Sequence, residues 1–111
     1  MKLLDLVKIQ LLAYNNHDLD GFCACFHPEV RLYETDELVS TGREALRERY
    51  AEMFAGGGFG ASVSERLLTE NHCVDLEHWW IQMPGEEKEE GTLLARYSLL
   101  DGLIESVQFL D

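Results

Sequence analysis

A chain of 111 residues, 46% of them hydrophobic and 27% charged, has the composition of one folded domain and not of a disordered protein. Nine Lys and Arg against 21 Asp and Glu give a net charge of −12, which argues against binding to nucleic acids or to anionic membrane surfaces. No stretch approaches the ~20 consecutive apolar residues of a membrane span.

The first predicted element is an amphipathic helix over residues 2–15, because Leu3, Val7 and Leu11 recur at helical spacing. Polar side chains interrupt this apolar segment, and no small-residue cleavage site follows it, so it does not have the pattern of a secretory signal peptide. The odd number of cysteines, three, indicates free thiols in a reducing compartment. We therefore predict a cytoplasmic protein whose single domain covers residues 1–111.

A second helix is predicted after Asp18, which can cap it, with apolar positions that extend to Phe26. Pro28 should end this helix, because the residue before a proline avoids the α-helical region. Cys23 and Cys25 would point in diverging directions on a helix, and a structural zinc site needs four converging ligands. We predict no metal site here.

The alternation of Val30, Leu32 and Glu34 with two outward residues predicts a strand over residues 29–34. A polar turn and a short extended piece at 38–39 follow, and then a third helix over residues 43–55. The glycine-rich segment 56–60 is predicted to be a turn or a mobile loop. It lacks the Gly-Lys-Ser/Thr ending of a phosphate-binding loop.

The remaining chain has the period of β-structure, with strands predicted over residues 61–70, 72–83, 91–100 and 103–110. Asp101-Gly102 is a strong signal for a two-residue hairpin turn. Helices that come first and an antiparallel meander that comes last predict an α+β fold. In this fold a curved antiparallel sheet packs on the N-terminal helices.

Four segments, residues 13–20, 26–30, 41–46 and 97–104, resemble short motifs of the nuclear transport factor 2-like (SnoaL-like, ketosteroid isomerase-like) superfamily. They are the first helix junction, the beginning of the first strand, the Gly-Arg-Glu-Ala-Leu start of helix three and the final hairpin. The resemblance implies a cone-like roll with an apolar pocket for a small apolar organic ligand. It also implies a homodimer formed through the outer face of the sheet.

Glu34 is the candidate catalytic residue. It shares a strand face with Val30 and Leu32, so its carboxylate is expected to be partly desolvated, which suits a general base. By the resemblance, Glu34 also falls where ketosteroid isomerases keep their catalytic aspartate. The alternative is that Glu34 lies at the end of the strand and is simply solvated.

The rest of the isomerase pattern is altered in this chain. The resemblance places Gln10 where the isomerases have the tyrosine of the oxyanion hole, and no carboxyl residue stands at 94–96, where they have the protonated aspartate. These departures count against steroid isomerase activity itself.

Five residues are predicted to bind the ligand or to shape its pocket: Gln10, Tyr14, Trp79, Arg96 and Tyr97. Adjacent Trp79 and Trp80 should point to opposite faces of their strand, one into the pocket and one toward a partner subunit. Arg96 could pair with Glu34 or a substrate anion, or alternatively with Asp75 or Glu77 across the sheet. Tyr97 could offer its hydroxyl to a ligand or serve packing alone.

Two histidines, His72 and His78, share one face of the strand predicted over 72–83, and Cys73, Asp75, Glu77 and Trp79 share the other. The two histidines are six positions apart on one strand, which is ~20 Å, so they cannot jointly hold a small substrate or a metal. Each is either a surface histidine or a group that acts alone.

Two functions follow from these observations. The first is a cofactor-independent isomerase, cyclase or dehydratase that uses Glu34 for proton transfer. The second is a non-catalytic ligand-binding or dimerisation module with the same pocket, which the altered oxyanion positions favour.

Overall fold

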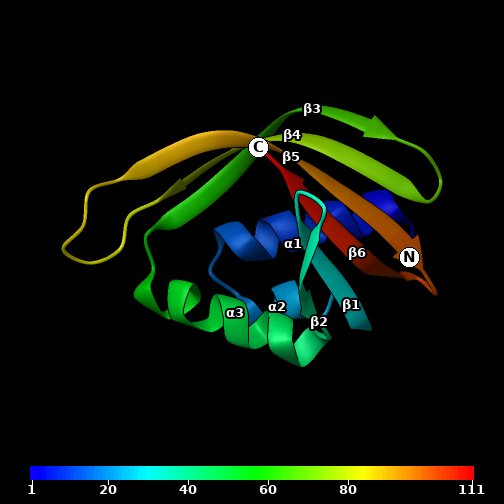
Figure 1. The fold of residues 1–111 in the computed structure, drawn as a ribbon, viewed down its shortest axis with the longest axis horizontal. Helices are drawn as coiled ribbons and strands as arrows, with labels where there is room; N and C mark the ends of the chain where they lie inside the picture. Colours follow the sequence, from blue (N-terminus) through cyan, green and yellow to red (C-terminus); the bar gives the residue numbers. More distant parts are fainter.

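The computed structural model describes residues 1–111 as three helices and a six-stranded sheet that arches over them (Figure 1). The helices are α1 (Leu3–Asn15), α2 (Leu19–Cys23) and α3 (Arg43–Gly56). The strands are β1 (Phe26–Glu34), β2 (Glu37–Thr41), β3 (Phe59–Leu68), β4 (His72–Ile81), β5 (Glu89–Leu100) and β6 (Leu103–Leu110). None of the helices has the length and apolar character needed to cross a membrane.

The strand order in the sheet is β2-β1-β6-β5-β4-β3, and every neighbouring pair is antiparallel except β1 and β6, which are parallel. The predicted α+β class and the C-terminal meander β3 to β6 are thus confirmed. The parallel pair closes the fold, because it places the first strand beside the last, and the three helices lie under the concave face of the sheet (Figure 1).

The predicted bounds of the second helix are wrong. α2 ends at Cys23 and β1 already begins at Phe26, two residues before the proline that was expected to stop the helix. The parallel strand explains the difference, since Phe26 pairs with Ile104 and the Ile104 N–H donates to the carbonyl of Cys25 at 3.0 Å. Tertiary pairing overrides the local helical pattern here.

Several local signals have the predicted effect. Asp18 caps α2 by accepting a hydrogen bond from the Gly21 N–H at 3.0 Å. Asp101 and Gly102 both have positive φ, 52° and 75°, as a tight hairpin turn requires. The glycine-rich loop is shorter than predicted, because β3 begins at Phe59 and not at residue 61.

The core lies between the helices and the concave face of the sheet. Leu3 and Val7 of α1 and Ile104 of β6 are almost fully buried. Towards the C-terminal end of α1, a cluster of rings from all three helices and from β1 and β3 continues the core: Tyr14, Phe22, Phe26, Tyr50, Phe54 and Phe59.

The open edge of β3 is covered at one point by side chains and not by another strand. Asn15, the last residue of α1, donates to the carbonyl of Ala61 at 2.9 Å and accepts from its N–H at 2.8 Å. His17 stacks on Phe59 and hydrogen bonds to its carbonyl at 3.1 Å. The junction between α1 and α2 therefore fixes the edge of the sheet beside the pocket described next.

Candidate functional site: an apolar pocket with one carboxyl group

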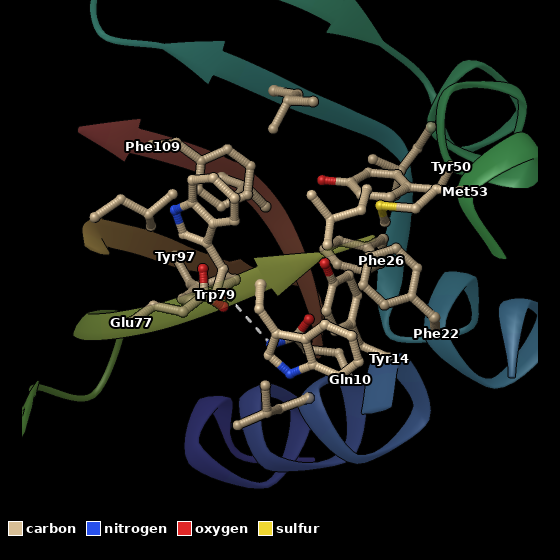
Figure 2. A pocket seen from close by; sticks show the side chains of 17 residues that line it. Gln10, Tyr14, Phe22, Phe26, Tyr50, Met53, Glu77, Trp79, Tyr97 and Phe109 are labelled. Carbon is tan, nitrogen blue, oxygen red and sulfur yellow. Dashed lines mark hydrogen bonds between the residues drawn. The ribbon is translucent and has the colours of Figure 1, made fainter. Parts of the chain in front are cut away.

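A pocket of about 260 Å³ lies between the helices and the concave face of the sheet (Figure 2). Fifteen of its 17 lining residues are hydrophobic, which is typical of a site for a small organic molecule. The lining residues are Gln10, Leu11, Tyr14, Phe22, Phe26, Leu32, Leu46, Tyr50, Met53, Glu77, Trp79, Trp80, Ile81, Leu93, Tyr97, Val107 and Phe109.

Four of the five residues predicted to bind a ligand line this pocket: Gln10, Tyr14, Trp79 and Tyr97. Gln10 is only 5% exposed, because its amide is held inside the protein. The amide nitrogen donates to the Val7 carbonyl at 3.1 Å and to the Tyr97 hydroxyl at 3.3 Å, the bond drawn in Figure 2. Gln10 therefore orients the Tyr97 hydroxyl, which keeps its own proton available for a ligand.

Glu77, on β4, is the one charged residue that lines the pocket, and the sequence-based reasoning did not select it. Figure 2 shows it among apolar side chains, beside Tyr97 and Trp79. Burial, together with the negative charge of Asp75, raises the pKa of Glu77 from 4.5 to about 7. Close to neutral pH, Glu77 therefore exists in comparable amounts as a carboxylic acid and as a carboxylate.

The strand alternation contained a signal for Glu77. Alternation puts Glu77 on the strand face of Trp79, which is one of the residues predicted to bind the ligand. The inward-facing residues of β4 also include Cys73 and Asp75, which are both buried. The face was thus predicted, but the carboxyl group on it was not recognised as part of the site.

Asp75 is buried behind the pocket and is balanced by Arg66 of β3. The guanidinium donates to both carboxylate oxygens, at 2.6 Å and 2.9 Å, and the thiol of Cys73 lies 3.3 Å from one of them. Asp75 is 2% exposed, so the bidentate pair provides its charge compensation inside the protein. The charge of Asp75 lies on the same strand face as Glu77.

Three tyrosines of the pocket are neutral phenols at physiological pH. Burial and the nearby Glu77 raise the pKa of Tyr14 to about 12, and burial also raises the pKa values of Tyr50 and Tyr97 well above their usual range. These three hydroxyls can donate hydrogen bonds to a bound molecule, but they cannot serve as bases near neutral pH.

Glu34 does not line the pocket, and the expectation that its carboxylate is desolvated is wrong. Its side chain is 57% exposed and forms an ion pair with Arg49 of α3. Leu32, two residues earlier on the same strand face, does reach the pocket. Glu34 is the last residue of β1, so it lies beyond the pocket wall, where Arg49 and solvent both reach it.

Trp79 and Trp80 both border the pocket, and each lies against a glycine of a neighbouring strand. A Cβ atom added to Gly91 would lie 2.9 Å from the Trp79 ring, and one added to Gly60 would lie 2.8 Å from the Trp80 indole nitrogen. Trp80 is 37% exposed, and the ammonium of Lys88 lies 5.3 Å from its ring centroid. Trp80 therefore lies at the solvent side of the site.

Arg96, the fifth predicted ligand-binding residue, lies outside the pocket. Its guanidinium does not pair with Glu34, Asp75 or Glu77, and it donates instead to the Gln108 side chain across the sheet at 2.9 Å. His72 and His78 are exposed, and His78 hydrogen bonds to Ser64 at 2.9 Å. The acidic partners that could have made these histidines catalytic, Asp75 and Glu77, lie on the opposite face of the strand.

The cysteines lie outside the pocket lining. Burial raises the pKa of Cys25 to about 11 and that of Cys73 to about 12, and the thiol of Cys25 donates to the carbonyl of Gly21 at 3.6 Å. Near neutral pH these thiols are protonated and therefore poor nucleophiles.

The family described as the SnoaL-like domain matches residues 9–107, and no curated protein matches the chain in sequence. An uncharacterized cystatin fold protein from Novosphingobium aromaticivorans is 22% identical, with a TM-score of 0.90 and coverage of 100% of this chain and 99% of that one.

Two further structures carry names that mention steroids. RV0760c from Mycobacterium tuberculosis, in complex with estradiol-17beta-hemisuccinate, is 14% identical, with a TM-score of 0.86 and coverage of 96% and 90% of the two chains. Delta 5-3-ketosteroid isomerase from Mycobacterium sp. is 11% identical, with a TM-score of 0.90 and coverage of 100% and 94%. At these identities the likeness concerns the fold alone.

Proposed function

This chain belongs to the SnoaL-like domain family, and from that premise we propose that its pocket binds a small, largely apolar organic molecule. The observation that carries the proposal is the pocket itself: a concave, apolar space with few polar groups, which is the usual character of a ligand site. Members of the fold that bind steroids lend support, since RV0760c was solved with estradiol-17beta-hemisuccinate.

A pair of neighbouring residues on β5 offers a matched test. Leu93 lines the pocket, whereas Leu94 is 41% exposed and does not. Leu93→Trp should fill the cavity and abolish binding of a neutral bicyclic probe, 2-naphthylmethanol, and Leu94→Trp should leave it intact. Binding can be followed by calorimetry. Equal affinities of the two variants would refute binding in this pocket.

Proton transfer is a second candidate function, and the raised pKa of Glu77 favours it. A group with a pKa of about 7 is available as both acid and base at neutral pH, as catalysis at a carbon next to a carbonyl requires. Glu34, the base predicted from its strand face and by resemblance, is the competing candidate, although it lies outside the pocket lining. The reaction class would be a cofactor-independent isomerisation, cyclisation or dehydration.

The two carboxyl groups can be separated by one exchange experiment. The enolisable ketone 2-tetralone is incubated in deuterated water, and the protein-dependent exchange of its α-protons is followed by NMR. If Glu77 is the base, Glu77→Gln should lower the rate by ~100-fold or more, and Glu34→Gln should have little effect. The reverse result would assign the role to Glu34. If the wild type does not catalyse the exchange, proton transfer is refuted and ligand binding remains as the proposed function.

We further propose a homodimer through the outer face of the sheet. Leu67, Val74, Leu76 and Leu94 form a shallow apolar patch there, and Leu67 is 76% exposed. A second copy of the chain could cover this patch. Leu67→Glu should then convert a dimer into a monomer, as measured by analytical ultracentrifugation. A wild type that is monomeric at about 50 μM, a concentration at which weak dimers still form, would refute the proposal.

A further inference from the structure

The pocket contains an acidic group that no basic group of the protein balances. Glu77 is the one charged residue among the 17 that line it. The protein supplies its carboxyl group with neither a hydrogen-bond donor nor an ion-pair partner: the bonds at this end of the pocket join Gln10 to Tyr97 and Arg66 to Asp75. The carboxyl group of Glu77 is thus left to interact with whatever occupies the pocket.

Two basic groups of the elements around the pocket are engaged elsewhere. Arg66 is bound through two hydrogen bonds to Asp75, and Arg49 pairs with Glu34 outside the pocket lining. Neither is free to neutralise Glu77. The titratable groups that face Glu77 carry no positive charge: they are Asp75 on its own strand and the tyrosines of α1, α3 and β5 described above.

The walls around this carboxyl group are mainly aromatic. Eight of the lining residues carry aromatic rings, and they come from both the helices and the sheet. Ring faces attract cations through their quadrupole, and Trp and Tyr do so best. Together with a carboxylate, such rings form the type of surrounding that binds an ammonium group.

We infer that the pocket selects a hydrophobic amine: an apolar body held by the aromatic walls, with a protonated nitrogen against the Glu77 carboxylate. This inference rests on the proposed function and specifies its ligand class. The ammonium would supply the positive charge that the protein does not provide, while the Tyr97 hydroxyl, oriented by Gln10, remains free for a second polar atom of the ligand.

Binding of an amine should release a proton. Without a counter-charge, desolvation and Asp75 keep Glu77 largely protonated below a pKa of about 7. An ammonium at contact distance favours the carboxylate, so the proton leaves Glu77 as the amine binds. The affinity for an amine should therefore rise by roughly tenfold per pH unit up to the pKa of Glu77 and then level off.

Three probes with the same body and different charge test the inference: 2-naphthylmethylamine, 2-naphthylmethanol and 2-naphthoate. We expect the amine to bind at least ~10-fold more tightly than the alcohol at pH 7.5, and the carboxylate to bind most weakly. Calorimetry at pH 7 in buffers of different ionisation enthalpy should detect a released fraction of a proton with the amine and none with the alcohol.

Glu77→Gln should bring the amine and the alcohol to within ~3-fold of each other and remove the pH dependence. Glu70→Gln, which removes one negative charge from an exposed position outside this pocket, should retain both effects. If the alcohol binds and the amine binds no better, the amine inference is wrong and the proposed binding function stands. If none of the three probes binds, both fail.

Discussion

Replacement of Glu77 by glutamine should stabilise the fold, and the size of the effect should depend on pH. The pKa of Glu77 is about 7 in the folded protein and 4.5 in its ordinary state, so the folded chain binds the proton more tightly than the unfolded one. Below pH 4.5 both states are protonated, and the group has no effect. As the pH rises from 4.5 to about 7, Glu77 ionises first in the unfolded state, and the wild type loses stability.

The magnitude follows from the two pKa values. Each pH unit between them corresponds to about 1.4 kcal/mol, so the loss is complete above pH 7 at about 3 kcal/mol. The neutral amide of Glu77→Gln does not undergo this ionisation. The variant should therefore match the wild type near pH 4.5 and exceed its free energy of unfolding by up to about 3 kcal/mol at pH 8.

Urea denaturation of the wild type and Glu77→Gln at pH 4.5, 6 and 8 measures this difference. Glu70→Gln is the control for the loss of one negative charge from a chain of net charge −12, and we expect its effect to be within about 0.5 kcal/mol of zero at every pH. A difference between the wild type and Glu77→Gln that stays constant from pH 4.5 to pH 8 would refute the reasoning, since it would mean that Glu77 titrates alike in both states.

Three further predictions concern stability and packing, and all can be measured by urea unfolding. Asp18→Ala removes the cap of α2 and should cost about 1 kcal/mol; a neutral effect would mean that the cap is dispensable. Arg66→Met leaves Asp75 buried without its partner and should lower the free energy of unfolding by about 3–5 kcal/mol, and the additional change Asp75→Leu should restore much of this loss. A double variant that is as unstable as Arg66→Met alone would contradict this account. Gly91→Ala brings a Cβ within 2.9 Å of the Trp79 ring, so it should lower the free energy of unfolding by about 1–3 kcal/mol and change the near-ultraviolet circular dichroism spectrum. A variant with wild-type stability and spectrum would show that the Trp79 ring can move aside without cost.

The order of elements could be predicted from the sequence because each signal is local. Helical spacing defines α1 and α3, and Asp101-Gly102 has the chemistry of one turn type. The start of β1 could not be predicted in this way, since Phe26 becomes a strand residue through pairing with Ile104, almost 80 positions away.

The site was predicted less completely for a related reason. Alternation tells which face of a strand a side chain occupies, but not how far along the pocket it lies. Alternation predicts a partly desolvated Glu34, yet β1 ends at this residue, and its carboxylate is exposed and paired with Arg49, as the alternative of a solvated strand end implies. Glu77 lies four residues before the end of β4 and therefore remains inside.

The side chains of Asn15 and His17 have a consequence for how copies of this chain can meet. An uncovered strand edge is a template for another strand, and growth by such pairing leads to aggregates. At Ala61 both backbone groups are already engaged by one amide, and the carbonyl of Phe59 is engaged by an imidazole. This end of the β3 edge is thus unavailable as a template for a strand of another copy, which removes one route to open-ended aggregation.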